Sequence, residues 1–236
     1  MRKILKKLLL GKVSIKDRPK SNPIRKCLKN VKSIWENDHH EDNGIEKIFR
    51  LTLSSSQLLF PGIYIKYLAN LRGFEYRDLI TDLYVLLKVL FPLFILKFGW
   101  QEHLFLVSLM VYLLLETVIY IPMLIFASDL LSKPRSYKRS MLLIFFNYIE
   151  IVFSFGVLYS LGNYLNKSFT HWFDAIYFSI VTSTSIGYGD YFPVTTHGKV
   201  LVSFQSLLFL FFVVLFLNFF SNKVKTKGYF EDQDEK

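Results

Sequence analysis

Four long apolar stretches dominate the pattern of hydrophobic and polar positions along this chain of 236 residues. Each holds about 20 residues, the length that a helix needs to cross roughly 30 Å of hydrocarbon. Within lipid such a stretch must be helical, because no water is present to satisfy its backbone groups. The pattern therefore predicts an all-α membrane protein with four transmembrane helices, at about 79–99, 103–128, 141–162 and 199–220.

A fifth apolar stretch, 51–70, is interrupted by polar residues. It contains three serines, Gln57, Lys66 and a Pro61-Gly62 break. A continuous span tolerates few such groups, since each must be satisfied inside lipid. We interpret this stretch as an interfacial segment, and its alternative is a fifth span that would place the basic N-terminal region outside the cell.

Positive charge is unevenly distributed among the segments that join the stretches. Residues 1–50 carry 14 Lys/Arg against 6 Asp/Glu, and basic residues recur in 129–140 and after the last stretch. By contrast, 100–102 has no basic residue and 163–170 has only Lys167. Cytoplasmic loops carry the excess of Lys and Arg, so we expect both termini and the 129–140 loop to be cytoplasmic.

Composition excludes several classes of protein. A hydrophobic content of 52% and a mean hydropathy of +0.30 exclude a disordered chain. The single cysteine, Cys27, excludes an intrachain disulfide and a cysteine-based metal cluster. The net charge of +10 suits nucleic acid or anionic lipid, and the long apolar stretches favour lipid, so we expect no nucleic-acid partner. The first 12 residues have too short an apolar core for a signal peptide.

The segment between the third and fourth stretches carries the most informative pattern. Residues 172–183 have the pattern of a short apolar helix, and a glycine-rich strand, 185–189, follows and ends at Asp190. Non-helical backbone at membrane depth is tolerated only where it is buried in protein or lines water. A re-entrant helix followed by an extended loop therefore predicts a pore.

The loop has residues that allow it to bind a dehydrated cation with backbone carbonyls. Turning successive carbonyls toward one axis requires alternate residues at positive φ, which glycine adopts at little steric cost. Gly187 and Gly189 supply those positions at a spacing of two, while Ile186 and Tyr188 are expected to point into a supporting wall. Ser185 adds a hydroxyl oxygen, and the carbonyl end of the preceding helix favours a cation nearby.

Residues Thr182–Asp190, TSTSIGYGD, resemble the signature of potassium channels. Flanking residues that resemble the same pore module are Trp172 to Phe178, Pro193, Gly198-Lys199 and Gln205. The resemblance covers about 141–222 and implies a selective potassium channel with K⁺ as the permeant ion and no other cofactor. The family uses four filter strands around one axis, so it also implies a homotetramer in the cell membrane.

The resemblance assigns roles to individual residues and segments. The implied selectivity filter consists of Thr184, Ser185, Ile186, Gly187, Tyr188, Gly189 and Asp190, with K⁺ bound by the backbone carbonyls of 185–189 and the Ser185 hydroxyl. The implied supporting residues are Trp172, Tyr177, Phe178 and Thr182. The predicted segments are a basic, partly interfacial cytoplasmic region (1–78), two transmembrane helices (79–128), a basic loop (129–140), a potassium channel pore domain (141–222) and a cytoplasmic tail (223–236).

Several positions depart from the family pattern. Ser185 replaces the usual threonine, and we expect Ser185→Thr to leave potassium-over-sodium selectivity unchanged or higher. Val181 stands where some relatives carry glutamate, so we hypothesise that Asp190 instead hydrogen-bonds Tyr177. The last stretch has no glycine hinge between 199 and 220. One of its phenylalanines could gate the pore by dewetting, but we favour packing against neighbouring helices.

Charged residues in the first two stretches suggest structural pairing. No stretch carries arginine at every third position, so we expect weak voltage dependence. Lys88 and Glu116 lie at depths that allow an ion pair between the first two helices; the alternatives for Glu116 are protonation or a hydrogen bond to Tyr112 or Tyr120. Glu150 lies in the third stretch and is a candidate for pairing with a neighbouring subunit.

Three further features leave alternatives open. Residues 1–16 have a basic amphipathic pattern that suits an anionic membrane surface, or form a disordered tail. Residues 38–42 are either a divalent-metal site or, as we favour, a solvated loop. Cys27 is either a palmitoylation site or, as we favour, a free thiol.

No constellation of base, nucleophile or phosphate-binding loop is present in the sequence, so we do not expect an enzyme. The competing functions are a non-selective cation channel and a non-conducting membrane sensor or scaffold subunit.

Overall fold

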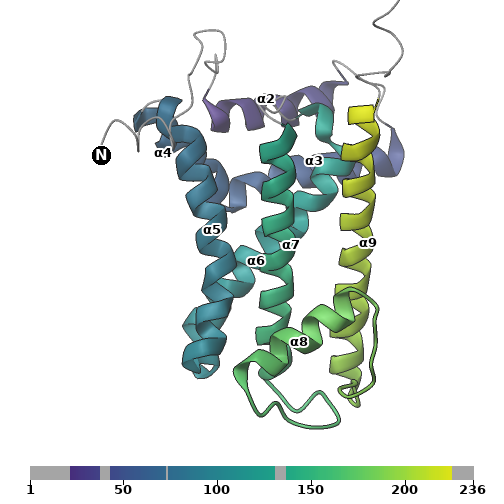
Figure 1. Ribbon diagram of the computed structural model, residues 1–236. Coiled ribbons are helices and arrows are strands. Elements are labelled where there is room, and N and C mark those ends of the chain that lie inside the picture. The colour runs from purple at the N-terminus through teal and green to yellow at the C-terminus, as the bar shows by residue number, and fades with distance from the viewer. Residues whose placement is uncertain (1–21, 38–42, 73, 131–136, 225–236) are drawn as a thin grey trace, which may run out of the picture. The chain divides into compact units, whose positions relative to one another are not determined.

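The computed structural model describes residues 22–37, 43–72, 74–130 and 137–224. The chain divides into two compact units, Met1–Ser132 and Lys133–Lys236. Apart from one isolated β-bridge, all regular structure in the described residues is helical (Figure 1). The first unit contains α2 (Pro23–Glu36), α3 (Gly44–Ser56), η2 (Gln57–Leu59), α4 (Pro61–Arg72), α5 (Phe74–Phe98), η3 (Trp100–Glu102), α6 (Leu104–Phe126) and η4 (Ser128–Leu130). The second contains α7 (Tyr137–Ser160), α8 (Trp172–Ser183) and α9 (Thr196–Val224).

Four helices in the described parts of the chain are long and apolar enough to cross a membrane. They are Tyr76–Phe98, Leu104–Phe126, Lys138–Ser160 and Thr196–Leu217. These helices confirm the predicted all-α membrane protein with four spans. The last begins three residues before the predicted start, because the Thr195 hydroxyl accepts the Gly198 N–H at 3.1 Å and so caps its first turn.

The polar stretch 51–70 is not a single span. Its residues belong to α3, η2 and α4, and α4 begins at Pro61, whose missing N–H suits the first turn of a helix. The segment contacts α6 at two points: the Gln57 side-chain nitrogen lies 3.0 Å from the Met123 sulfur, and the Gly62 N–H donates to Glu116 Oε1 at 2.9 Å. The prediction that this stretch does not span is confirmed, and its interfacial location stays a prediction.

α2 packs on α3 through an apolar face. Asn22 caps the helix by accepting the Ile24 N–H at 3.0 Å, and Asn37 ends it in the left-handed conformation. Cys27 and Ile34 are buried, and the Cys27 thiol donates to the Ser54 carbonyl at 3.2 Å. A thiol buried against α3 is not accessible to an acyl chain, so the interpretation of Cys27 as a free thiol is supported.

The predicted ion pair between α5 and α6 is present. Lys88 Nζ lies 3.4 Å from Glu116 Oε2 and donates to Thr117 Oγ1 at 2.5 Å. The Tyr84 hydroxyl also donates to Glu116. Tyr112, an alternative partner predicted from its position one turn away, instead donates to the Leu59 carbonyl at 2.5 Å. The Tyr112 hydroxyl thus bonds to the backbone of η2 instead of to Glu116, four residues later in its own helix.

Residues 1–16 and 38–42 lie outside the described residues, so the amphipathic pattern and the metal hypothesis stay predictions. Glu150 is buried in α7.

Candidate functional site

The candidate pore helix, α8, has the bounds that the sequence predicts. It begins with a reciprocal cap in which His171 Nδ1 accepts the Phe173 N–H and the Asp174 carboxylate accepts the His171 N–H. The His171 amide, assisted by the Thr170 hydroxyl and amide, holds the pKa of Asp174 below its usual range. A carboxylate in the first turn also interacts favourably with the positive end of the helix dipole.

A buried hydrogen-bond network holds α8 between α7 and α9. The Gln205 side-chain amide donates to Ser179 Oγ at 2.7 Å and to the Ser179 carbonyl at 3.1 Å. Tyr159 donates to Gln205 Oε1 at 2.7 Å, and Ser179 donates to the Val152 carbonyl at 2.6 Å. All three helices contribute, so the position of α8 is defined by directional bonds in addition to apolar packing. The sequence marked Gln205 only by its place at the start of the last helix, and it gave no signal for Ser179 or Tyr159.

Aromatic packing surrounds the middle of α8. Phe178 is buried and lies edge-on to Tyr159 at 4.8 Å between centroids, with Phe169 and Tyr191 as further ring neighbours. Trp172 sits at the first turn against His171 and Phe173. Of the predicted supporting residues, Phe178 therefore lies in the core, whereas Trp172 lies at the helix start.

The chain leaves α8 through a Schellman motif. The Ser185 N–H donates to the Thr182 carbonyl at 3.1 Å and the Ile186 N–H to the Val181 carbonyl at 3.1 Å. This pattern places the residue after the cap in the left-handed region, usually as glycine. Here that residue is Ser185, with φ of 57°. Beside this motif, the Thr184 hydroxyl donates a further hydrogen bond to the Ile180 carbonyl at 2.8 Å.

Positive φ recurs at every second residue of the candidate filter. Ser185, Gly187 and Gly189 have φ of 57°, 61° and 83°, and the residues between them do not share this conformation. The prediction for the two glycines is confirmed. The extension of the alternation to Ser185 was missed, although continuing the spacing of two backward from Gly187 would have found it.

The outer end of the loop is fixed by hydrogen bonds to the segment after α7. Asn166 donates through its side-chain amide to the Asp190 carbonyl at 3.3 Å, and it exchanges two bonds of 3.0 Å with the Phe192 backbone. Burial and then the nearby Asp190 carboxylate raise the pKa of the Tyr177 phenol, and the hypothesised hydrogen bond between these two side chains stays a prediction. At α9, Gly198 approaches the Tyr164 backbone so closely that an added Cβ would lie 2.8 Å from the Tyr164 carbonyl oxygen.

Two side chains of the loop are not packed as predicted. Ile186 and Tyr188 were expected to point into a supporting wall, yet they are 52% and 69% exposed. The described residues of a single chain supply no wall around them. From α7, the Tyr148 hydroxyl shares a hydrogen bond of 3.0 Å with Ser183 Oγ at the end of α8.

Two phenylalanines of α9, Phe209 and Phe212, pack against the Tyr148 ring of α7. Phe212 is buried and lies 5.2 Å from the Tyr148 ring, and Phe209 lies 6.0 Å from the same ring. These contacts support the packing interpretation over a gate for both residues. Phe211 is more exposed than either.

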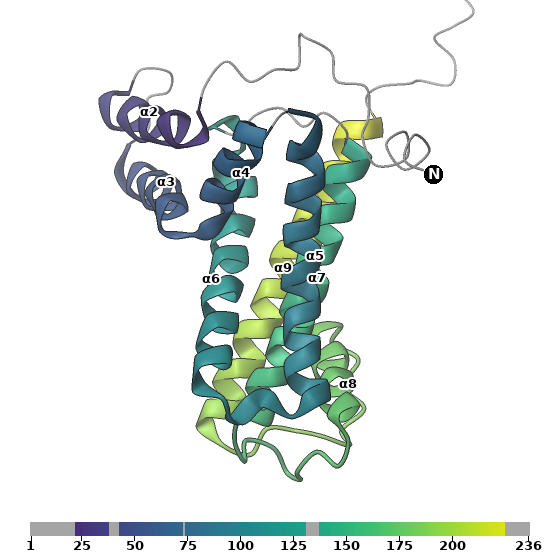
Figure 2. The ribbon, with the colours of Figure 1, turned by 90° about the vertical axis from the view of Figure 1, so that its left-hand side faces the viewer.

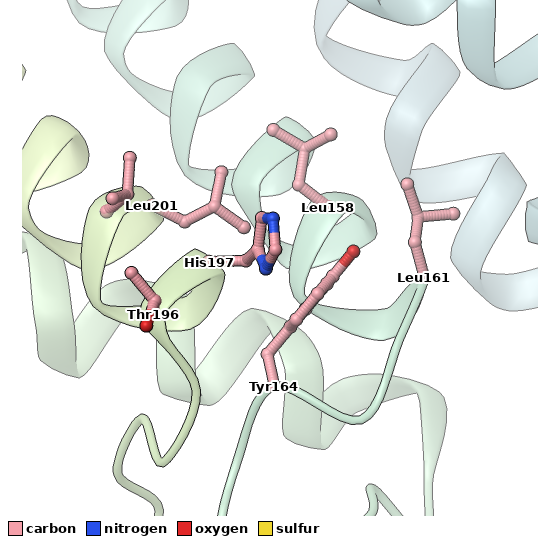
Figure 3. Close-up of a pocket in the computed structure, with 7 residues that line it drawn as sticks. Leu158, Leu161, Tyr164, Thr196, His197 and Leu201 are labelled. Carbon is pink, nitrogen blue, oxygen red and sulfur yellow. The ribbon is translucent and has the colours of Figure 1, made fainter.

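A groove lies between the end of α7 and the start of α9, away from the glycine-rich loop. It has a volume of about 430 Å³ and is lined by Leu158, Leu161, Tyr164, Thr196, His197, Val200 and Leu201. His197 and Tyr164 lie close to each other within it (Figure 3). Across the described residues, no group of three His, Cys, Asp or Glu side chains is arranged to hold a metal ion.

Comparison with known proteins places the second unit. Residues 141–226 match the family model described as "Ion channel". The chain is 39% identical over 46 residues to the "Hyperpolarization-activated voltage-gated potassium channel" of Methanocaldococcus jannaschii, which covers 20% of this chain and 22% of that protein. It is 40% identical over 58 residues to "Potassium channel K1" of Plasmodium berghei, covering 24% and 3% of the two chains.

A mouse protein, "Potassium voltage-gated channel subfamily A member 6", is 38% identical over 63 residues, covering 26% of this chain and 12% of that protein. No solved structure matches the chain significantly. The matched stretches thus span at most 22% of each of these relatives. The segment that the family model matches, residues 141–226, contains most of α7 together with α8, the glycine-rich loop and α9; it resembles ion channels, and the relatives named above are potassium channels.

Proposed function

We propose that this protein is a potassium-selective channel through which K⁺ passes down its electrochemical gradient. The observation that carries the proposal is the alternation of positive φ at Ser185, Gly187 and Gly189 directly after a firmly held helix. Such alternation rotates successive peptide planes, which brings their carbonyl oxygens to one side of the strand. A row of carbonyls replaces the hydration shell of a permeating ion without placing full charges in the pore.

The ring of oxygens requires several copies of the strand, and we propose a homotetramer. The exposure of Ile186 and Tyr188 supports assembly, because large apolar and aromatic side chains left bare by one chain suit burial against other copies. Each subunit would contribute the carbonyls of 185–189 and the Ser185 hydroxyl to the K⁺ sites. Thr184 caps the C-terminus of the pore helix, and Asp190 would hold the outer end of the filter by a hydrogen bond to Tyr177.

The pore helix also contributes electrostatically. The C-terminus of a helix carries a partial negative charge, which favours cations within about a turn. α8 ends at Ser183, directly before the filter. Four such helix ends directed at one axis would therefore stabilise an ion at the inner entrance of the filter.

The topology proposed for the channel follows from its basic segments. Residues 1–50 and the 129–140 loop carry most of the excess Lys and Arg, which favours a cytoplasmic location for both and, with an even number of spans, for the C-terminal tail. Transport through this pore requires no cofactor other than the permeant ion, and no enzymatic step is proposed.

Ion flux into liposomes that contain the purified protein tests the proposal. We expect uptake of potassium but not of sodium, with block by barium, and a mass of four chains in detergent solution. Equal sodium and potassium flux would support the non-selective alternative. Absence of flux from correctly assembled protein would support a sensor or scaffold.

Gly187→Ala is a sharper test of the filter. A Cβ at Gly187 meets nothing within 4 Å in the chain, so the substitution acts through its φ of 61°, at a cost of roughly 1–2 kcal/mol. We expect potassium flux to fall at least about tenfold. Gly99→Ala is the matched control, because Gly99 also has a positive φ and open space but lies at the end of α5. Equal flux in the two variants would contradict the assigned filter.

A further inference from the structure

The segment from α3 to the start of α4 lies beside the C-terminal half of α6. Phe49 contacts Phe126 in the last turn of α6, and the Gln57 side chain lies 3.0 Å from the Met123 sulfur one turn earlier. The start of α4 reaches Glu116, near the middle of the same helix. Because α6 is a candidate membrane span, we expect α3 and the start of α4 to lie at the level of the leaflet at the C-terminal end of α6.

The outer face of α3 has the side chains that an acyl environment requires. Ile45 and Ile48 are 86% and 67% exposed, and Leu59 in η2 is also exposed. Two hydroxyls on this face are internally satisfied: Thr52 donates to the Ile48 carbonyl at 2.8 Å and Ser55 to the Thr52 carbonyl at 3.2 Å. A polar group with an internal partner enters an apolar medium at a much lower cost than one without.

The outer face of α2 is basic. Arg25, Lys29 and Lys32 are exposed and recur at intervals of four and three residues, so they share one face of the helix. Lys32 forms an i,i+4 pair with Glu36 at 3.6 Å, but both side chains are largely exposed and such a pair is weak. The face therefore keeps a net positive charge, which complements phosphate-bearing lipid headgroups.

The relative placement of α2 and α3 matches the layers of a leaflet. Figure 2 shows the two helices stacked across the C-terminal end of α6, with α3 nearer the middle of α6 and α2 beyond it. The exposed indole of Trp35 lies at the end of α2, where Lys47 donates to its backbone carbonyl at 2.9 Å. Tryptophan is enriched at the boundary between acyl chains and headgroups.

We infer that the α2–α3 hairpin is a docking surface for anionic phospholipids, with the isoleucines of α3 in the acyl region and the basic residues of α2 against the headgroups. Under the proposed topology this surface faces the cytoplasmic leaflet, the leaflet that carries anionic lipid. The surface is independent of the filter, so the inference does not rest on ion conduction.

The headgroup contact is tested with spin-labelled lipids around the reconstituted full chain. The association of phosphatidylglycerol relative to phosphatidylcholine is measured by electron paramagnetic resonance. We expect the triple variant Arg25→Gln, Lys29→Gln, Lys32→Gln to lower the preference for phosphatidylglycerol at least about threefold. The double variant Lys29→Arg, Lys32→Arg keeps the charge and should retain the preference for phosphatidylglycerol. The control Lys97→Gln removes a charge in the last turn of α5, outside the basic face of α2, and should leave the preference unchanged. An undiminished preference in the triple variant would overturn the inference.

The depth of α3 is tested with a nitroxide at Ile48→Cys in a Cys27→Ser background, in which the serine keeps the donor to Ser54. We expect the label to collide with oxygen, which concentrates in acyl chains, as strongly as a reference label at Leu115→Cys on α6. A label at Lys29→Cys should instead favour a water-soluble nickel complex. If the label at Ile48 favours the nickel complex, the surface faces water and suits an acidic soluble partner instead, and the lipid inference is wrong.

Discussion

The two units hold polar side chains among apolar helices in different ways. In the second unit, Gln205, Ser179 and Tyr159 form a network of uncharged hydrogen bonds. In the first unit, Lys88 and Glu116 form an ion pair. Neutral groups lose little when they leave water provided that each has a partner, whereas charged groups lose much more. The bonds that position α8 are therefore of the less costly and more directional kind, and the Lys88–Glu116 ion pair lies where α5, α6 and the start of α4 meet.

The largest expected effect concerns the ion pair. Lys88→Met leaves the Glu116 carboxylate without its cation, and Glu116→Leu leaves the ammonium buried; we expect each to destabilise the first unit by about 3–5 kcal/mol. The double variant should recover much of that loss, because it removes both charges. Thermal unfolding in detergent measures all three. If the double variant is as unstable as the sum of the singles, the two residues are not coupled.

The neutral network should be less sensitive. Gln205→Leu leaves the Tyr159 hydroxyl without its acceptor and the Ser179 carbonyl without one donor, and we expect a loss of about 2–3 kcal/mol. Potassium flux should fall as well, because α8 loses its bond to α9. Gln57→Leu is the control, since its amide contacts only a thioether sulfur among the bonds described. A loss equal to that of the ion-pair variants would remove the contrast between the two units.

A smaller effect is expected at Ser185, the filter residue in the left-handed region. Ser185→Gly removes the Cβ that makes φ of 57° unfavourable, and we expect a gain of up to about 1 kcal/mol together with lower selectivity, because the hydroxyl is lost. Ser185→Thr keeps the hydroxyl, and we expect potassium-over-sodium selectivity to be unchanged or higher. Reversal potentials under mixed potassium and sodium gradients measure both. A clear fall in selectivity for the threonine variant would contradict the assigned role of the hydroxyl.

The smallest effect concerns pH. The His171 amide and Thr170 lower the pKa of Asp174, so the ionised carboxylate stabilises the start of α8. A depressed pKa gives stability that is present above the ordinary aspartate value of about 4 and is lost as the pH falls through the lowered value. Because Asp174 is largely solvated, the loss should remain under about 1 kcal/mol. Asp174→Asn should flatten the dependence of unfolding on pH in this acidic range, and an unchanged dependence would show that other carboxylates cause it.

Local patterns predicted much of the fold. The four spans and the bounds of α8 follow from runs of apolar residues, and the positive φ of Gly187 and Gly189 follows from their spacing. The Lys88–Glu116 pair was predictable from depth, because intramembrane charges require partners.

Other features depend on contacts between distant residues and were not predictable from local sequence. The partners of Gln205 lie 26 and 46 positions away, and Asn166 reaches a carbonyl 24 positions away. The break at Pro61 was visible, but not that the following helix contacts Glu116. The expected packing of Ile186 and Tyr188 is not met within one chain, where both side chains are exposed, and their packing in an assembly stays a prediction.

The bond from the Gly62 amide to Glu116 has a consequence for biosynthesis. The first turn of α4 receives its acceptor from a residue 54 positions later in the chain. While the ribosome is still making α6, that turn exposes backbone donors that lipid cannot satisfy. We therefore expect α4 to reach its final position only after α6 has entered the bilayer, so that the order of insertion would differ from the order of synthesis.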